Sequence, residues 1–339
     1  MKQVVLEKPG QLRLSEAPAP GAPGPGEALV RVHRVGVCGT DLHAFGGRQP
    51  YFTYPRIIGH ELGVTVEAVG PGVSNITVGD RCAVEPALNC GRCVACRAGR
   101  GNCCVRLEVL GVHVDGGMRG MMLLPAAKLH PSAKLSLDQL ALVETLAVGA
   151  HAVRRAAVAA GENVLVIGAG PIGLSIAAFA LASGAKLIVM DLRPERLRFC
   201  REVLGIEHVL PADENALAMV SGITGGDLPT AVFDATGSGR SMSAAFEYVA
   251  HGGRLVFAGL FQGDVTFSDP HFHRREISLL ASRNSTAEDF ARVIWTVESG
   301  IVDPARWITH RCRLEETPER FPAWAGGSLE CIKAVVEID

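Results

Sequence analysis

A glycine-rich turn between two apolar stretches limits the fold of this chain more than any other part of its sequence. The apolar run Asn163–Ile167 leads into Gly-Ala-Gly-Pro-Ile-Gly at 168–173, and an apolar stretch of helical length follows. A strand, a glycine turn and a helix in this order let a pyrophosphate approach the backbone at the helix N-terminus, where unpaired amides and the helix dipole favour an anion. We therefore predict a dinucleotide-binding unit whose phosphate contacts are Gly168, Gly170, Pro171, Ile172 and Gly173.

An acid at the end of the next apolar run indicates which dinucleotide binds. The run Lys186–Asp191 ends about 20 residues beyond the glycines, where a carboxylate binds both ribose hydroxyls and repels a 2′-phosphate. This position favours NAD. Arg193 and Arg196 follow, and arginines placed there can hold a 2′-phosphate, so NADP stays open as the less favoured alternative.

Two more apolar runs extend the same alternation of strands and helices. Residues 231–237 and 254–260 are strand-like, with a helical pattern between them, which is typical of a parallel, doubly wound α/β sheet. Ligands bind at the carboxyl ends of such strands, so we expect the reactive ring of the cofactor there. The residues predicted at this place are Thr236, Gly237, Ala258, Gly259 and Leu260.

The first part of the chain has a different pattern. Short alternating runs at 12–14, 28–32, 64–69 and 78–84 are separated by proline- and glycine-rich turns, which predicts a β-rich, partly barrel-like domain. A length of 339 residues exceeds the size at which one hydrophobic core keeps growing, and 48% hydrophobic residues suffice for two cores. We therefore expect two domains, a helical segment after residue 285 and a strand at 329–338.

Two short segments of the β-rich part carry metal-binding side chains. Cys38, His60 and Glu61 supply the thiolate, imidazole and carboxylate that hold catalytic zinc, and three protein ligands leave a fourth position open. Thr40 and His43 lie close behind Cys38, so a hydroxyl beside the metal can pass a proton to an imidazole that titrates near neutral pH. The alternative is a buried thiol among ordinary loop histidines, but the clustering favours the metal site.

A second cysteine cluster predicts a structural metal site. Cys90, Cys93 and Cys96 are separated by two-residue gaps, and Cys104 follows with Cys103 beside it. Four thiolates in one lobe suit a closed tetrahedral zinc site that stabilises the fold and has no open position. The spacing does not choose between Cys103 and Cys104, and a disulfide-bonded or reactive lobe is the alternative.

Glu144 falls inside an apolar run of helical periodicity that begins at Leu137. Charged groups are almost never fully buried without a partner, so this carboxylate either points outward or faces a cation such as the zinc. From these residues alone, the outward orientation and the contact with a cation are equally supported.

Charge and apolar patterning exclude several classes of partner. The net charge is −2 and no block of basic residues occurs, so the electrostatic features of a nucleic-acid or anionic-membrane binder are missing. The first residues lack the long apolar core of a signal peptide, and no uncharged apolar run of about 18 residues suggests a membrane span. We expect a cytoplasmic protein with small-molecule partners, whose ten cysteines stay reduced.

Together, the two cysteine-containing segments and the glycine-rich motif resemble the zinc-dependent medium-chain dehydrogenase/reductase family, which includes alcohol, sorbitol and threonine dehydrogenases. The resemblance covers nearly the whole chain and implies a Rossmann doubly wound sheet plus a β-rich GroES-like catalytic domain. The implied organisation is a catalytic domain at 1–148 with its zinc lobe at 90–104, an NAD-binding domain at 149–285, and a return to the catalytic domain at 286–339. It also implies a homo-oligomer, a dimer or a tetramer, with the strand 254–260 as an interface candidate.

The resemblance assigns zinc ligands to individual residues. It implies that Cys38 and His60 bind a catalytic zinc ion and that Glu61 binds it or exchanges with a ligand. Glu144 occupies the position of the third ligand, as in the sorbitol dehydrogenase branch of the family. Whether the two glutamates bind the ion directly or through water stays open.

The remaining roles follow from the same resemblance. Thr40 and His43 match the proton relay of the family, and Asp41 matches the carboxylate that orients a ligand histidine. Cys104 matches the fourth ligand of the structural zinc, so we expect two zinc ions per chain. We also predict a cofactor contact for Arg283.

Several loops, among them 45–50, 111–117 and 282–284, are similar to the branch of the family that oxidises sugar acids. We predict oxidation of a secondary alcohol of a sugar acid or polyol to a ketone, with Arg48 or His113 meeting a substrate carboxylate. A polyol or L-threonine dehydrogenase is the enzymatic alternative. A sensor that binds zinc and a nucleotide without catalysis is the alternative from another class.

Overall fold

The chain divides into two units in the computed structural model, which describes residues 1–327 and 331–339. One unit consists of Met1–Glu144 and Ser285–Asp339, and the other is the continuous segment Thr145–Asn284. The division falls within helix α3 (Leu137–Arg155), because that helix runs on from the first segment into the second.

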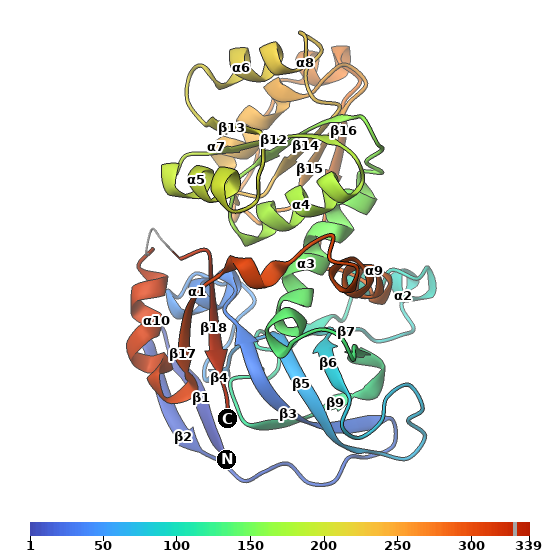
Figure 1. Cartoon of the computed structure of the whole chain (residues 1–339), viewed down its shortest axis with the longest axis vertical. Helices are drawn as coiled ribbons and strands as arrows, with labels where there is room; N and C mark the ends of the chain where they lie inside the picture. Colours follow the sequence, from blue (N-terminus) through green and yellow to red (C-terminus); the bar gives the residue numbers. More distant parts are fainter. Residues whose placement is uncertain (328–330) are drawn as a thin grey trace. The chain divides into compact units, whose positions relative to one another are not determined.

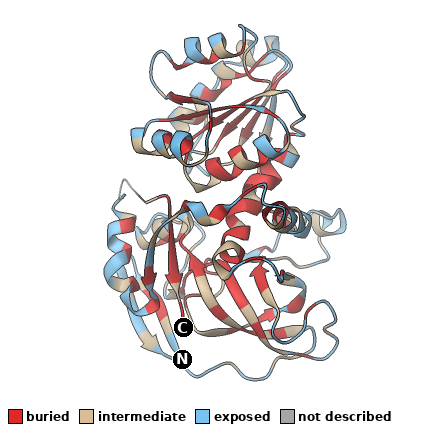
Figure 2. Cartoon of the chain, in the orientation of Figure 1, coloured by how far each residue is buried: buried red, intermediate tan, exposed pale blue. Residues whose placement is uncertain are grey.

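The segment Thr145–Asn284 is built on a six-stranded sheet in which every neighbouring pair of strands is parallel. The order is β13-β12-β11-β14-β15-β16, which confirms the predicted doubly wound sheet. Its inner strands are buried because they consist mainly of valine, leucine, isoleucine and phenylalanine (Figure 2). The strands are β11 (Asn163–Ile167), β12 (Lys186–Asp191), β13 (His208–Pro211), β14 (Ala231–Asp234), β15 (Arg254–Phe257) and β16 (Ser278–Ala281).

Helices connect these strands and pack on both faces of the sheet (Figure 1). The helix after the glycine turn begins at Pro171, since proline is favoured in the first turn, where its missing N–H costs no hydrogen bond. The helices are α4 (Pro171–Ala182), α5 (Pro194–Glu202), α6 (Ala216–Ile223), α7 (Gly239–Ala244) and α8 (Asp269–Arg274).

The position of β15 corrects one expectation about assembly. The sequence suggested residues 254–260 as an exposed strand edge, but β15 lies between β14 and β16 and pairs with both. The outer strand on this side is β16, and three of its four residues are exposed. An interface at this edge of the sheet therefore cannot pair with residues 254–257.

The other unit is β-rich, as predicted. Its largest sheet has the order β10-β6-β5-β3-β18-β17, and β9 also pairs with β3. The strand β18 lies inside this sheet, antiparallel to β3 and parallel to β17, so the last part of the chain returns to the first (Figure 1). The strands are β3 (Glu27–Gly36), β5 (Glu61–Val69), β6 (Arg81–Val84), β9 (Met121–Pro125), β10 (Leu129–Pro131), β17 (Ile308–Arg313) and β18 (Lys333–Glu337).

Smaller elements complete this unit. Two short sheets have the orders β2-β1-β4 and β7-β8. The strand predicted at 329–338 is confirmed by β18, while Leu329, where the prediction begins, lies outside the described residues. The strand β17 and the helix α10 were not predicted. The remaining elements are β1 (Lys2–Lys8), β2 (Gln11–Glu16), β4 (Arg56–Ile57), β7 (Ala87–Leu88), β8 (Glu108–Val109), α1 (Gly39–Phe45), α2 (Val94–Arg97), α9 (Ala287–Glu298) and α10 (Thr317–Ala325).

A network of four charged side chains ties the start of α3 to the sheet. Asp138 Oδ1 accepts from Arg34 Nε at 2.9 Å, and Asp138 Oδ2 accepts from Arg311 Nη2 at 2.6 Å. Arg311 Nη1 also donates to Glu337 Oε1 at 3.0 Å. Burial raises the pKa of Asp138, but the two guanidinium groups outweigh burial and hold this pKa below its usual value of 3.8.

We expect Asp138→Asn to lower the free energy of unfolding by about 1 kcal/mol near neutral pH, because the pairs are partly exposed. The folded-state pKa of Asp138 is depressed, so its stabilisation is present above 3.8 and is lost as the pH falls through the folded value. Thermal unfolding of wild type and variant across this range should show the two curves converging below pH 3.8. A difference that does not change with pH would contradict the ion-pair origin.

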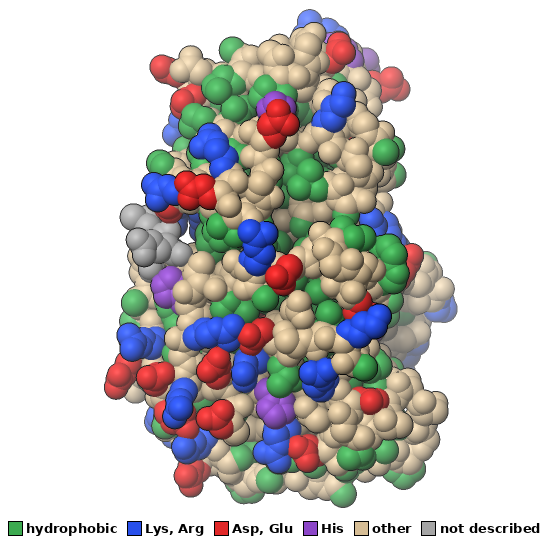
Figure 3. All heavy atoms as spheres, in the orientation of Figure 1, with side chains coloured by type: hydrophobic (Ala, Val, Ile, Leu, Met, Phe, Trp, Pro, Cys, Tyr) green, Lys and Arg blue, Asp and Glu red, His purple; other side chains and the backbone are tan. Residues whose placement is uncertain are grey.

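Charged side chains on the face drawn in Figure 3 are mixed in sign. Basic and acidic groups lie side by side over much of that face, which agrees with the net charge of −2. Such a surface lacks the single-sign field that attracts polyanions. Among the described residues, we find no helix with both the length and the hydropathy needed to cross a bilayer.

Candidate active site

The first turn of α1 and the start of β5 carry the predicted ligands of the catalytic zinc. Cys38 directly precedes α1, and His60 and Glu61 lie where β5 begins. One carboxylate joins the two segments, since Asp41 Oδ2 accepts from the Cys38 N–H at 2.9 Å and Oδ1 accepts from the Gly59 N–H at 3.1 Å. Gly59 has a φ of 92°, and a Cβ there would lie 2.6 Å from a neighbouring valine methyl group, so the turn requires glycine.

The ligand atoms of Cys38, His60 and Glu61 all lie within 4.8 Å of one another. Two of the atoms at this place, His60 Nδ1 and Glu61 Oε2, are buried and have no hydrogen-bond partner in the described part of the chain. His60 Nδ1 lies 3.8 Å from Asp41 Oδ1. Buried polar atoms without partners are costly, and thiolate, imidazole and carboxylate are the ligand types of zinc, so these residues fit a zinc ion.

The charge balance of this cluster also favours a bound cation. Burial lowers the pKa of His60, but the neighbouring Cys38 and Asp41 outweigh burial and hold this pKa well above its usual value of 6.5. Burial raises the pKa of Asp41 above its usual value of 3.8. Several acidic groups thus compete for few positive charges, and a divalent cation would neutralise them.

Lys333 completes the cluster and was not predicted from the sequence. Its Nζ donates to Glu61 Oε1 at 2.6 Å and to Val37 O at 3.2 Å, and both charged side chains are only 1% exposed. The available signal was a lysine that directly precedes the apolar residues 334–336 of a buried strand. Gly36 leaves the room for this pair, because a Cβ there would lie 2.0 Å from Glu61 Oε2.

Glu144 lies near the cluster but is not one of the three residues whose ligand atoms converge. It keeps partial solvent exposure, yet loss of hydration raises the pKa of its carboxyl group to about 7. The neighbouring carboxylates add to this rise, while His60 and Lys333 oppose it. The carboxyl group of Glu144 thus interacts electrostatically with the charged cluster, and its direct ligation of zinc stays a prediction.

The two predicted relay residues share one face of α1. Thr40 and His43 are three positions apart in this helix, so their side chains are neighbours, although no direct hydrogen bond joins them in the described residues. Thr40 is half-buried, and His43 is covered on one side while part of its surface stays exposed to solvent. Partial burial lowers the pKa of His43, and the positive charge of Arg48 lowers it further. Thr40 is thus close to Cys38 in α1, and His43 lies one turn further along the helix, where it reaches solvent. Transfer of a proton along these two residues stays a prediction.

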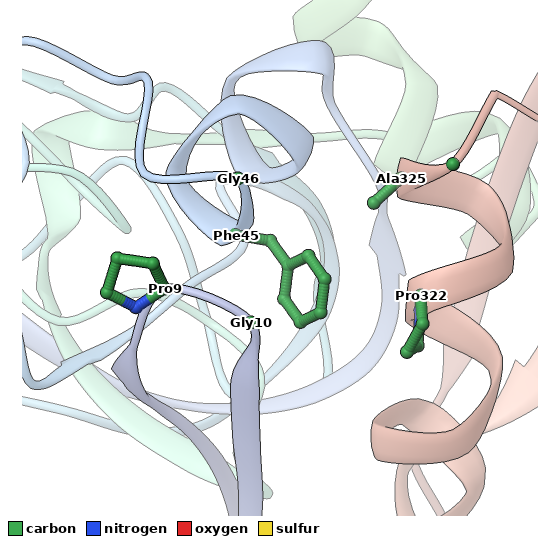
Figure 4. A pocket seen from close by; sticks show the side chains of 7 residues that line it. Pro9, Gly10, Phe45, Gly46, Pro322 and Ala325 are labelled. Carbon is green, nitrogen blue, oxygen red and sulfur yellow. The ribbon is translucent and has the colours of Figure 1, made fainter.

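The far end of α1 is anchored in an apolar hollow. The Phe45 ring lies between Pro9 and Pro322 (Figure 4) and packs on Phe321 with ring centroids 5.4 Å apart. The Gly10 N–H donates to the Phe45 carbonyl at 2.8 Å. Since none of the residues that line this hollow is a predicted site residue, we assign it to the support of α1 and not to substrate binding.

The lobe at 90–104 gathers four thiols in the same way. Cys104 Sγ accepts from the N–H groups of Cys90 and Arg106, both at 3.3 Å, and Asn89 Nδ2 donates to Cys96 Sγ at 3.6 Å. A backbone N–H from Arg92, followed by the hydrogen bond with Cys104, lowers the pKa of the Cys90 thiol to about 6. Donors aimed at sulfur favour thiolates, so the lobe fits a zinc ion. The four sulfur atoms within 4.8 Å of one another belong to Cys90, Cys93, Cys96 and Cys104.

Cys103 is not part of this set, which gives the choice between the neighbouring cysteines a direct test. We expect Cys104→Ser to lower the zinc content by one ion per chain, because a closed site needs all four ligands. Cys103→Ser is the matched control and should keep the wild-type zinc content. Elemental analysis after dialysis measures both, and the reverse pattern would assign Cys103 as the ligand.

The residues predicted to meet a substrate carboxylate lie on loops. Arg48 follows α1 and is exposed. His113 is half-buried, its Nδ1 accepts from the Val109 N–H at 3.1 Å, and its ring stacks with Tyr51 at 6.3 Å. Because Nδ1 is the acceptor, the neutral ring carries its proton on Nε2 and can donate from there. Contact with a substrate stays a prediction for both residues.

The glycine-rich turn has the backbone geometry that phosphate binding needs. Gly168 has a φ of 98°, and its N–H donates to Met190 O at 2.7 Å. A Cβ on Gly173 would lie 1.7 Å from Gly168 O, so helix and turn meet too closely for a side chain. Gly170 caps α4 and Pro171, which has no N–H, begins the helix, so the N–H groups that suit an anion are those of the next residues, Ile172 and Gly173.

The acid expected at the ribose stands beside this turn at the end of β12. Asp191 Oδ2 accepts from the Ala169 N–H at 2.6 Å, and Oδ1 accepts from the Arg193 N–H at 2.8 Å. Arg196 Nη1 lies 3.8 Å from the same carboxylate. The structure thus brings together the acid that favours NAD and the two arginines that favour NADP.

The other predicted cofactor contacts follow three strands at the same edge of the sheet. Thr236 packs on the glycine turn, since a Cβ on Gly168 would lie 3.0 Å from Thr236 Cγ2. Leu260 is 62% exposed, and Arg283 is exposed as well. These contacts are Thr236 and Gly237 after β14, Ala258, Gly259 and Leu260 after β15, and Arg283 after β16.

Comparison with known proteins finds relatives over the whole chain. Residues 24–134 match the alcohol dehydrogenase GroES-like domain, and residues 171–299 match the zinc-binding dehydrogenase family. The chain is 40% identical to L-galactonate-5-dehydrogenase of Escherichia coli (strain K12), over 99% of this chain and 98% of that protein. It is 32% identical to sorbitol dehydrogenase of Bacillus subtilis (strain 168), over 99% and 97% of the two chains.

A solved structure has the same fold. It is a short chain alcohol dehydrogenase (rspB) of Escherichia coli CFT073, complexed with the cofactor NADH. The TM-score is 0.92 at 30% sequence identity, and the match covers 99% of each chain.

Proposed function

Because this chain belongs to the zinc-dependent medium-chain dehydrogenase/reductase family, we propose that it oxidises a secondary alcohol of a sugar acid or a polyol to a ketone with NAD. As an oxidoreductase of the alcohol dehydrogenase family it acts on CH–OH groups. The observation that carries the proposal is the convergence of Cys38, His60 and Glu61, with two buried polar atoms that lack partners.

Two sets of residues would hold the metal ions. Cys38, His60 and Glu61 suit a catalytic zinc ion, with Glu144 as a further ligand or as the partner of a bound water, and the four lobe cysteines suit a structural one. Bound zinc supplies a Lewis acid that favours loss of the substrate hydroxyl proton, and NAD supplies the hydride acceptor. Asp41 links both ligand-bearing segments through its hydrogen bonds and would orient His60, whose Nδ1 lies 3.8 Å from Asp41 Oδ1.

Thr40 and His43 would move the proton. The Thr40 hydroxyl accepts the substrate proton and donates its own toward His43. The lowered pKa of His43 keeps its imidazole neutral near pH 7, so that it can accept this proton, and its exposure lets the proton leave to solvent.

The cofactor would bind to the segment Thr145–Asn284 through the predicted contacts around the glycine turn. We favour NAD over NADP because Asp191 ends β12, where a carboxylate binds the ribose hydroxyls and repels a 2′-phosphate. We propose the organisation given by the resemblance, with catalytic residues 1–148 and 286–339 and NAD-binding residues 149–285. We further propose a cytoplasmic homo-oligomer, a dimer or a tetramer.

L-Galactonate, oxidised to D-tagaturonate, is the substrate we propose first. The support is the 40% identity with L-galactonate-5-dehydrogenase over nearly the full length of both chains. Arg48 is exposed beside α1, and the neutral His113 ring carries its proton on Nε2, so a guanidinium or an imidazole N–H is the group we propose for binding the substrate carboxylate. A polyol or L-threonine dehydrogenase uses the same machinery on another secondary alcohol.

A spectrophotometric screen of NAD reduction tests the proposal. The panel contains sugar acids, polyols and L-threonine, and we expect the largest kcat/KM for L-galactonate. A preference for a polyol or threonine would replace the substrate and keep the reaction class. A chain that binds zinc and NADH but oxidises no secondary alcohol would instead support the sensor, and elemental analysis giving one zinc ion would remove one metal site.

A further inference from the structure

One buried carboxylate controls the turn that follows β14. Asp234 is the last residue of that strand and is fully buried. Its Oδ1 accepts from the Thr236 N–H at 2.9 Å and from the Thr236 hydroxyl at 2.7 Å, and its Oδ2 accepts from the Ser241 hydroxyl at 2.5 Å. All three donors belong to residues 236–241, so the carboxylate fixes this turn against the strand end.

The backbone of the same residue holds the turn after β15. The Asp234 carbonyl accepts from the Ala258 N–H at 2.9 Å and from the Gly259 N–H at 3.0 Å. The two turns also touch directly, because a Cβ on Gly259 would lie 2.4 Å from Gly237 N, and a Cβ on Gly237 would lie 2.8 Å from Leu260 O. A shift of either turn therefore displaces the other.

We propose that Asp234 is a positioning residue for the nicotinamide end of the cofactor, which it aligns by holding residues 236–237 and 258–259 as one surface without touching the cofactor. The proposal rests on the proposed NAD-dependent function. A carboxylate suits this role because it accepts all three hydrogen bonds and, when ionised, strengthens each of them. In Asp234→Asn the amide has no charge, and the Ser241 hydroxyl would have to turn and accept from the NH2 group, so the buried hydrogen bonds of the turn are weakened and no water can replace them.

Binding of two nucleotides separates this role from a general structural one. ADP-ribose contains the adenosine and the pyrophosphate but lacks the nicotinamide, so it reports on the glycine turn alone. For Asp234→Asn we expect the Kd of NADH to rise about tenfold and the Kd of ADP-ribose to stay within about twofold of wild type. Isothermal titration of the full-length chain gives both constants, with the melting temperature as the check of folding.

Two further variants keep the test decisive. Ser241→Ala removes one of the three donors and should raise the NADH Kd about threefold, so it decides the question if Asp234→Asn does not fold. Asp213→Asn, an exposed carboxylate that caps a turn in the same segment, is the matched control and should change neither constant. Folded variants at position 234 or 241 that bind both nucleotides like wild type, or weaken both equally, would overturn the proposal. A wild-type chain that binds neither nucleotide would remove the proposed NAD site itself.

Discussion

Replacing Thr40 by valine should reduce kcat by about 10²–10⁴-fold, the range that a positioned proton-transfer group contributes. Valine has the shape of threonine without the hydroxyl, so the half-buried place in α1 stays filled. The zinc content, the Kd of NADH and the melting temperature should therefore match wild type. Steady-state rates of NAD reduction with the best substrate of the panel measure the effect.

Thr40→Ser is the matched control, because it keeps the hydroxyl and loses only a methyl group. We expect this variant to retain kcat within about tenfold of wild type. The same order of loss in both variants would attribute the effect to packing of α1. Unchanged turnover in Thr40→Val would remove the hydroxyl from the proton path.

Loss of the Lys333 charge should have the largest effect on stability. In Lys333→Met the Glu61 carboxylate would stay buried without its partner at 2.6 Å, which costs about 3–5 kcal/mol. We expect a melting temperature lower by roughly 10 °C in zinc-depleted protein. The double variant Lys333→Met with Glu61→Gln should recover part of this loss, because the amide leaves no unpaired charge behind.

The pair Lys2–Glu315 offers a control of the same geometry. Its N–O distance is also 2.6 Å, but both side chains are exposed, so Lys2→Met should leave the melting temperature unchanged. Circular dichroism melts of the four proteins test the prediction. A Lys333→Met chain as stable as wild type would mean that the buried pair contributes no net stability, and that solvent reaches Glu61 when the lysine is gone.

The sequence predicted those parts of the site whose residues lie close together in the chain or share the ligand chemistry of one metal. The glycine turn and Asp191 are recognisable because φ requirements, strand periodicity and the following acid occur within about 25 contiguous residues. Cys38, His60 and Glu61 were recognisable because their types match one metal, and the cysteine lobe because its spacing is regular. Only the fold brings the segments around Cys38 and His60 within ligand distance, through the hydrogen bonds of Asp41.

The parts that could not be predicted depend on partners far away in the chain. Lys333 pairs with Glu61 across 272 positions, and nothing near either residue specifies the other. The burial of β15 has the same origin, because an apolar strand gives no sign of its order in a sheet. Asp234 is hidden for the opposite reason, since its partners are close by but an acid at a strand end is ordinarily exposed.

The place of β18 in the sheet sets the order in which the protein can mature on the ribosome. This strand pairs with residues 34–36 of β3 and supplies Lys333, yet it is translated after the whole segment Thr145–Asn284. The contiguous segment can fold while synthesis continues. Until β18 is translated, the nascent segment Met1–Glu144 has a gap beside β3 and its Glu61 carboxylate lacks a counter-ion. We therefore expect the segment Thr145–Asn284 to fold first and the cluster around Glu61 to close when the last strand inserts.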